Sequence, residues 1–169
     1  MGKPTTAALI LLVAGTAAVG PAAITPPEGA RLLLSARAEG VQIYACEGED
    51  QGFAWVFKAP EATLIDRSGG QAIRHFGGPS WQLADGTIVV DEVVAEADAP
   101  QPDSIPWLLL KAKSVEGAGV LAQASFIRRI ETKGGTPPDG GCNQTDTGRE
   151  ARIRYSAWSQ PPGRSVQIP

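Results

Sequence analysis

Short apolar segments, bounded by stretches rich in Gly, Pro and Asp, recur along most of this 169-residue chain. None of them extends into the 3.6-residue period of a long amphipathic helix. Segments of this length, separated by turn residues, are typical of strands. The pattern predicts an all-β fold: an antiparallel β-sandwich or barrel of roughly eight strands. The segments are 31–35, 41–46, 53–58, 62–65, 87–94, 107–113, 125–131 and 153–158.

Segment 53–58 has the two-residue alternation of a strand with one buried face. Phe53, Trp55 and Phe57 fall on the same face, and we expect these rings to form a stripe of the core. The Asp-Gly pair at 85–86 separates two apolar segments, which predicts a tight hairpin there.

The N-terminal 23 residues differ from the rest of the chain. A single Lys3 precedes an apolar stretch of Ala, Leu, Ile and Val, which ends in small residues. This is the pattern of a secretory signal peptide, and it is shorter than the ~20 apolar residues of a membrane span. We expect residues 1–23 to be a signal peptide and residues 24–169 a single β domain, secreted or periplasmic. The alternative is an N-terminal membrane anchor.

The chain has two cysteines, Cys46 and Cys142. In an oxidising compartment, an even number of cysteines is read as a disulfide framework, and here only one pairing exists. We therefore expect a Cys46–Cys142 disulfide. A thiolate metal site or a redox pair is the alternative, which the absence of a Cys-x-x-Cys motif disfavours.

Composition excludes several classes of function. A net charge of −3 provides no electrostatic footprint for nucleic acid. The single histidine cannot build a multi-histidine metal site, and no glycine-rich nucleotide motif is present. We expect no cofactor, no metal, no nucleic acid partner and no membrane span after signal removal. The expected form is a monomer whose partner is a small molecule, a glycan or an envelope component.

The stretch from Asp66 to Asp85 is the most site-like part of the sequence, because it holds the only histidine, His75. His75 is a candidate general base if Asp66 or Asp85 orients it. Ser68 or Ser80 would then be a candidate nucleophile or binding hydroxyl.

Tyr44, His75 and Trp81 are the candidate binding residues. Tyr44 is a further candidate hydroxyl, and Trp81 one of four tryptophans available for stacking on a sugar. The structural alternative has His75 hydrogen-bonded to a turn that the sequence Gly-Gly-Pro at 77–79 shapes.

A glycosidase uses two carboxylates, and the candidates for such a pair are Asp66, Asp85, Asp91 and Glu92. Adjacent positions in a strand face opposite ways, so Asp91 and Glu92 do not form one site, and a structural role is favoured. Likewise one of the adjacent Arg128 and Arg129 must face inward unless an acid such as Glu131 pairs with it.

Ordered sequence blocks along the mature chain resemble the domain-of-unknown-function family 3455, exported proteins of bacteria and fungi. The blocks are 40–46, 59–66, 75–81, 85–87, 105–110, 130–135 and 141–142, and the resemblance runs from about Pro27 to Trp158. It implies an exported β domain and carries over no catalytic residue.

Together these features predict an exported β domain that acts as a binding or envelope-associated module without catalysis. Two alternatives stay open: a secreted, hydrolase-like enzyme with its site around His75, and a purely structural surface protein.

Overall fold

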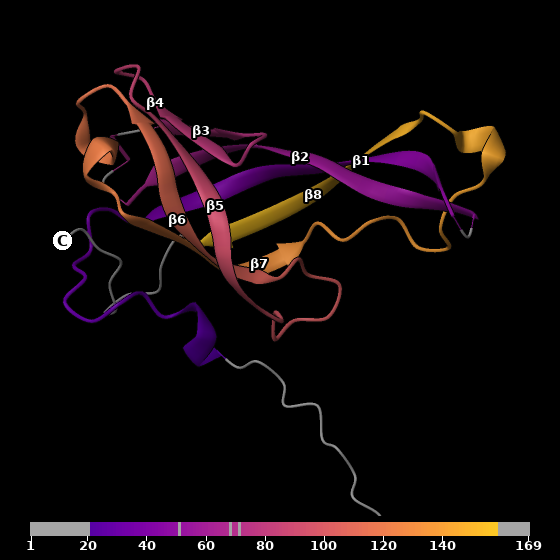
Figure 1. Ribbon diagram of the computed structural model, residues 1–169, viewed down its shortest axis with the longest axis horizontal. Helices are drawn as coiled ribbons and strands as arrows, with labels where there is room; N and C mark the ends of the chain where they lie inside the picture. Colours follow the sequence, from indigo (N-terminus) through magenta and orange to yellow (C-terminus); the bar gives the residue numbers. More distant parts are fainter. Residues whose placement is uncertain (1–20, 51, 68, 71, 159–169) are drawn as a thin grey trace, which may run out of the picture.

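Eight antiparallel strands form one sheet that closes on itself, with the first strand paired to the last (Figure 1). The computed structural model describes residues 21–50, 52–67, 69–70 and 72–158, so residues 1–20 of the expected signal peptide lie outside it. The all-β prediction is confirmed, and the architecture is a closed barrel. The strands are β1 (Ala36–Glu49), β2 (Gly52–Asp66), β3 (Ala72–Phe76), β4 (Ser80–Leu83), β5 (Ile88–Ala97), β6 (Trp107–Glu116), β7 (Phe126–Gly134) and β8 (Glu150–Trp158). Three short 3₁₀-helices are η1 (Pro21–Ile24), η2 (Val120–Gln123) and η3 (Gln144–Asp146).

The strands differ in two ways from the predicted segments. The prediction of a strand over 31–35 is wrong. Leu33 and Leu34 of this segment instead line a small apolar cavity together with Leu64 and Ile73. Segments 53–58 and 62–65 belong to one continuous strand, β2. Pro60 interrupts the apolar pattern without breaking this strand, because β2 pairs with β3 only from Ala62 onward, and an edge position tolerates the missing N–H.

Two apolar clusters hold the barrel together. The interior cluster includes Leu64, Ile73, Trp81 and Val89 from four successive strands. A second cluster lies where η1 packs on β5 and β6, and its centre is the fully buried Ile24 against Ala97, Leu109 and Ile130. The N-terminal segment therefore covers part of the barrel wall from outside.

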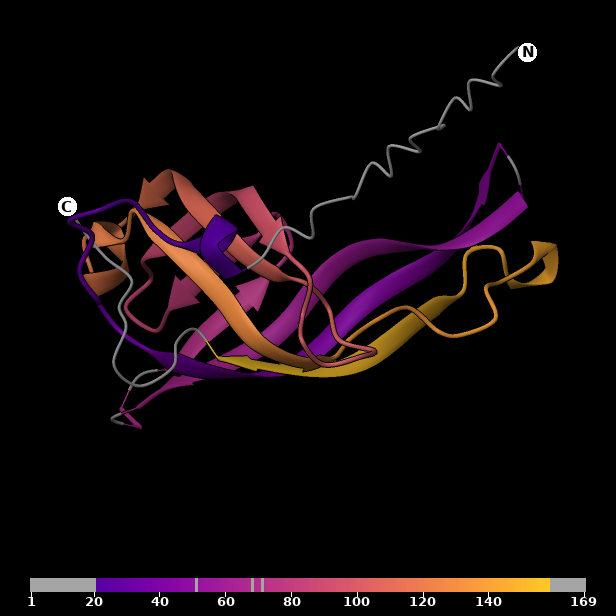
Figure 2. The same ribbon diagram turned by 90° about the horizontal axis from the view of Figure 1, so that it is seen from below.

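The expected core stripe of rings in β2 is wrong. Phe53 is 36% exposed and Phe57 is 49% exposed. For Phe53 the reason is tertiary: the β1–β2 hairpin extends well beyond the barrel, so its end has no opposite wall to pack against (Figure 2). Phe57 instead contacts Tyr44 edge to face, with ring centroids 5.7 Å apart. The indole N–H of Trp55 donates to the Gly141 carbonyl at 2.8 Å.

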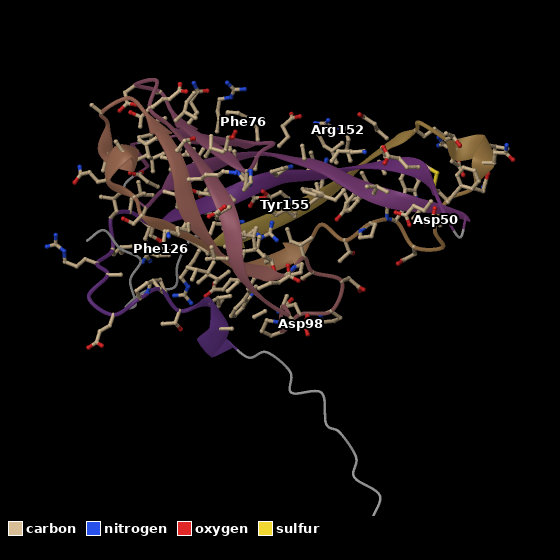
Figure 3. The ribbon with its side chains drawn as sticks, in the orientation of Figure 1. Asp50, Phe76, Asp98, Phe126, Arg152 and Tyr155 are labelled. Carbon is tan, nitrogen blue, oxygen red and sulfur yellow. A yellow bond between two sulfur atoms is a disulfide. The ribbon has the colours of Figure 1, made fainter. Side chains whose placement is uncertain are left out.

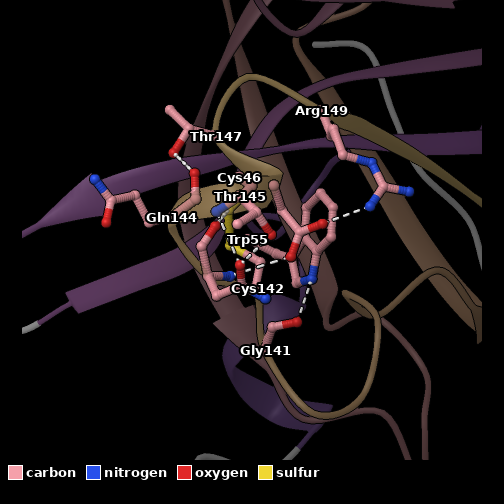
Figure 4. The surroundings of a disulfide bond; sticks show 10 residues. Cys46, Trp55, Gly141, Cys142, Gln144, Thr145, Thr147 and Arg149 are labelled. Carbon is pink, nitrogen blue, oxygen red and sulfur yellow. Dashed lines mark hydrogen bonds and ion pairs between the residues drawn. A yellow bond between two sulfur atoms is a disulfide. The ribbon is translucent and has the colours of Figure 1, made fainter.

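The predicted disulfide is confirmed, and it joins Cys46 in the extended hairpin to Cys142, 96 residues later in the sequence (Figure 4). Cys142 lies in the loop that precedes η3, where Asn143 caps the helix by accepting from the Thr145 N–H. The disulfide and the Trp55 hydrogen bond therefore fasten this loop to the end of the hairpin. Within the part of the chain described, no helix has the length and apolarity needed to cross a membrane.

Candidate ligand-binding cavity

The β3–β4 hairpin is too short to fill the wall between its neighbours. It pairs with β2 only over 62–65 and with β5 only over 88–90. Beyond these residues β2 and β5 continue without a strand between them. Each also carries a one-residue bulge there, at Lys58 in β2 and at Val94 in β5, and bulges bend a strand away from its partner.

A cavity of about 170 Å³ lies at this gap. Its walls are mainly apolar, and its polar lining consists of three side chains: Lys58, His75 and Arg129 beside the Trp81 indole. The apolar walls are formed by Phe57, Pro60, Pro79, Val93, Leu108 and Leu110.

His75 and Trp81 are opposite one another on β3 and β4, and their rings stack 3.7 Å apart. His75 is 4% exposed, and its Nδ1 lies 3.0 Å from the Ser80 carbonyl oxygen. A carbonyl can only accept, so Nδ1 carries the proton. Burial lowers the pKa of His75 to about 4, and the nearby Arg129 charge adds to this effect against the opposing Ser80 hydrogen bond. At neutral pH the ring is therefore uncharged, and Nε2 is an acceptor without a hydrogen-bond partner among the described residues.

Arg129 supplies the positive charge of this cavity. Its Nε and Nη2 donate to the Pro106 carbonyl at 3.2 and 2.9 Å. Nη1 has no hydrogen-bond partner, and no acid forms an ion pair with Arg129, among the residues that the structure describes. Burial lowers the pKa of Arg129, while Tyr155, Glu96 and Tyr44 act in the opposite direction. Of the two adjacent arginines, Arg129 is the one that lines this cavity.

Asp91 lies beside this site as a second buried ionisable group. It is 2% exposed, and its two carboxyl oxygens have no hydrogen-bond partner within the described chain. Burial raises the pKa of Asp91 to about 7, and the nearby Trp81 indole N–H opposes the shift without reaching hydrogen-bond geometry. Asp91 is held in place by its backbone N–H, which donates to Pro79 at 3.0 Å.

Tyr44 and Tyr155 add polar groups to the barrel interior, where Figure 3 shows Tyr155 inside the sheet. The Tyr44 hydroxyl donates to the Gly135 carbonyl at 2.6 Å. Burial raises the pKa of Tyr155 to about 12, against the opposing effects of Arg129 and Gln42. The hydroxyl of Tyr44, a predicted binding residue, is thus engaged by the Gly135 carbonyl, and Tyr44 is not among the residues that line the cavity.

The structure does not bring Asp66 or Asp85 to His75. The Asp66 carboxylate accepts from the Gly70 N–H at 2.9 Å, and the Asp85 carboxylate from the Thr87 N–H at 2.8 Å. Asp66 lies four residues beyond the partner of His75 on β2, roughly 13 Å along the strand. Both acids thus stabilise their own turns, which is the favoured use of Asp at such positions.

Neither of the candidate serine nucleophiles, Ser80 and Ser68, is placed by the structure as a free hydroxyl in the cavity. The Ser80 hydroxyl donates to the Gly77 carbonyl at 3.0 Å. Ser68 lies outside the described residues.

Asp91 is buried and Glu92 is exposed, so they do not form one carboxylate pair. No group of three or more His, Cys, Asp or Glu side chains suited to a metal ion exists in the described ranges.

Two of the three candidate binding residues, His75 and Trp81, stack on each other in the structure, whereas Arg129 and Asp91 were not predicted as binding residues. The signal for both was available. Each belongs to a pair of adjacent charged residues within a predicted strand, Asp91-Glu92 and Arg128-Arg129, and alternation requires one member of each pair to face inward.

Comparison with known proteins identifies a family over nearly all of the described chain. The family model described as "Protein of unknown function (DUF3455)" matches residues 26–158. No curated protein and no solved structure matches the chain significantly. The match covers more than half of the sequence and includes all eight strands. The chain therefore belongs to the DUF3455 family.

Proposed function

We propose that this protein is an exported small-molecule-binding barrel and that its ligand enters between β2 and β5. The observation that carries the proposal is the cavity of about 170 Å³ at that gap, with apolar walls and the polar groups of His75 and Arg129. Ligand sites in proteins typically combine such walls with a few placed polar groups. Eight-stranded barrels are also wide enough to hold one small ligand.

The size of the cavity limits the ligand. A cavity of ~150 Å³ in a protein core accommodates benzene. The volume of about 170 Å³ therefore fits a molecule with a single ring or a short carbon chain, with substituents extending toward the opening. Polysaccharide chains would contact the cavity only through a terminal unit.

Binding is favoured over catalysis by the surroundings of His75. A general base usually has an acidic partner that orients it. Here the hydrogen bond of His75 goes to a backbone carbonyl, that of Ser80. The hydrolase-like alternative predicts turnover of an ester, amide or glycoside panel that His75→Ala abolishes, whereas the binding proposal predicts no turnover. The alternative of a purely structural surface protein predicts that no small molecule binds.

Secretion to the periplasm or the medium is the second part of the proposal. It is supported by the signal-like sequence of residues 1–23 and by the Cys46–Cys142 disulfide, since disulfides persist in oxidising compartments. Expression of the full chain with a C-terminal tag, followed by fractionation and mass spectrometry of the N-terminus, tests it. A shortened, disulfide-bonded protein outside the cytoplasm is expected. Full-length protein retained in the cytoplasm would refute export.

The cavity is tested by blocking its mouth. Val93 lines the cavity and is 50% exposed, whereas Val94 is 47% exposed and does not line it. Ligand-observed NMR with a library of single-ring fragments is expected to give hits that Val93→Trp removes and Val94→Trp retains. If no fragment binds the wild type, or if both variants bind alike, the proposed site is wrong.

A further inference from the structure

We infer that the ligand of this cavity is a small hydroxycarboxylic acid, whose carboxylate binds Arg129 and whose hydroxyl donates to His75. This inference rests on the proposed binding function and adds the chemical class of the ligand. It is argued from the charge of the lining residues, the tautomer of His75 and the apolar wall between the polar groups.

The cavity lining carries positive charge and no acid. Its two cations are Lys58 and Arg129. Lys58 forms an ion pair with Glu47, and both side chains are about two-fifths exposed. The Lys58 charge is therefore compensated in solvent near the cavity rim. Of the two cations that line the cavity, Arg129 is the one without an ion-pair partner among the described residues.

Arg129 is arranged to bind an anion. Both of its hydrogen bonds use Nε and Nη2 and go to a single carbonyl, that of Pro106, which orients the guanidinium and leaves Nη1 available. A desolvated cation is costly unless an anion with matched hydrogen bonds accompanies it. A carboxylate suits the planar guanidinium because its oxygens can accept several of the N–H groups together.

His75 specifies a donor on the ligand. Because Nδ1–H is engaged by the Ser80 carbonyl, Nε2 can only accept. The low pKa of His75, about 4, keeps this acceptor unprotonated at neutral pH. Stacking on Trp81 fixes the plane of the ring, with an interplanar angle of 13°. A hydroxyl group satisfies this acceptor without adding charge beside Arg129.

The body of the ligand is apolar. Phe57, Leu108 and Leu110 belong to the walls of the same cavity that Arg129 and His75 line. A molecule that reaches both polar groups across these walls carries its carboxylate and hydroxyl on a compact hydrocarbon. 4-Hydroxybenzoate has this composition, and it has the single ring that the cavity volume allows.

Calorimetry on the mature, disulfide-bonded protein with four matched probes tests the inference. 4-Hydroxybenzoate is expected to bind most tightly. Benzoate lacks the hydroxyl donor, so we expect its affinity to be lower by about three- to tenfold. 4-Hydroxybenzamide and 4-hydroxybenzylamine replace the carboxylate by a neutral group and a cation, and we expect losses of about ten- to a hundredfold.

Variants assign each end of the ligand. His75→Phe keeps a ring for stacking and removes the acceptor, so it should weaken 4-hydroxybenzoate and leave benzoate unchanged. Arg129→Met should weaken both acids, and Arg129→Lys should restore part of the affinity. Arg154→Met, an exposed arginine on β8, is the control and should change neither. Circular dichroism confirms the fold of each variant, and the probe series with the wild type tests the charge requirement even if Arg129→Met does not fold.

The outcomes separate the two proposals. If none of the four probes binds and the fragment library also gives no hits, the binding function itself is wrong. If the probes bind but the amide or the amine matches the acid, the cavity is a binding site and the assignment of a carboxylate is overturned. Equal affinity of benzoate and 4-hydroxybenzoate for the wild type overturns the role of His75.

Discussion

The imidazole of His75 lies flat on the indole of Trp81, with centroids 3.7 Å apart and planes inclined by 13°. The pair comes from two strands that are joined by one short turn, and it stands between the side cavity and the closed interior of the barrel. Asp91 is next to the Trp81 indole on the following strand. Two ionisable groups therefore lie in one buried cluster, and burial shifts their pKa values in opposite directions, each toward the uncharged form.

Asp91→Asn is expected to stabilise the protein relative to the wild type, and to do so more at pH 8 than at pH 5. The folded-state pKa of Asp91 is about 7, above its ordinary value of 3.8, so the folded protein retains a proton that the unfolded chain has lost. Stability from this group therefore falls as pH rises toward 7. Asn mimics the protonated form, so its advantage should grow by roughly 2–3 kcal/mol between pH 5 and pH 8. Urea unfolding at the two pH values measures it.

His75 acts in the opposite direction. Its pKa falls from 6.5 to about 4 on folding, so its contribution to stability rises with pH between these values. The two groups compensate in the wild type, and the difference between Asp91→Asn and wild type isolates Asp91. Glu92→Gln changes the adjacent, exposed acid and serves as control. A stability difference for Asp91→Asn that is equal at both pH values would contradict the burial of this carboxyl.

Gly40→Ala should destabilise the barrel by about 2 kcal/mol or more, because it introduces overpacking. Gly40 is paired with β2 on one side and β8 on the other, and an added Cβ would lie 2.3 Å from the Glu61 carbonyl oxygen and 2.5 Å from the Ala62 Cβ. Backbone atoms cannot move aside as the end of a side chain can. Thermal unfolding measures the loss.

Gly48→Ala is the matched control in the same strand. Its Cβ would meet nothing closer than the Phe53 ring at 3.5 Å, which is ordinary contact. We expect a change within about 0.5 kcal/mol. Equal effects of the two substitutions would show that the close approach of β1 and β2 at Gly40 is incorrect.

Removal of the disulfide by the double substitution Cys46→Ala and Cys142→Ala should cost roughly 4–5 kcal/mol in the chain-entropy model. The bond closes a loop with a sequence separation of 96 residues, which it restricts in the unfolded chain. Urea unfolding of the variant should coincide with that of the reduced wild type. The oxidised protein should react with no thiol reagent when denatured, and reaction of two equivalents would refute the bond.

Ile24→Ala should destabilise the protein by about 2–5 kcal/mol. The Ile24 side chain is fully buried against Leu109 and Ile130 on the outside of the barrel. Leu32→Ala is the control, because Leu32 is 44% exposed in the same N-terminal region. If both substitutions have the same small effect on the unfolding midpoint, the N-terminal segment does not contribute to the fold.

Local sequence signals predicted part of this structure because they act over a few residues. The Asp85-Gly86 hairpin is present between β4 and β5. The predicted segments from 41–46 to 153–158 lie within strands to within one residue, whereas segment 31–35 does not form a strand. β3 was not among the predicted segments, since it is only five residues long and has Arg and His side by side between its apolar residues. Its neighbour β4 was recognised only through the hairpin turn.

The candidate site was predictable only where its members are close in sequence. His75 and Trp81 pair across one short turn, so the sequence sufficed to bring them together. Arg129 reaches the same cavity from β7, which lies across the barrel from β3, and no spacing rule links the two positions. Asp66 and Asp85 are nearer to His75 in sequence than Arg129 is, yet each faces its own turn.

The sequence by itself determined the all-β class and the turn between β4 and β5, because short apolar segments and turn residues act over a few positions. It also determined the cysteine pairing, because two cysteines allow only one disulfide. Only the tertiary structure decided which face of each strand is inside. Alternation defines two faces without naming the buried one, and so Phe53 is exposed near the end of the β1–β2 hairpin while Asp91 is enclosed. Pairing of β1 with β8 closes the sheet, and that long-range contact turns a row of strands into a barrel with an enclosed interior.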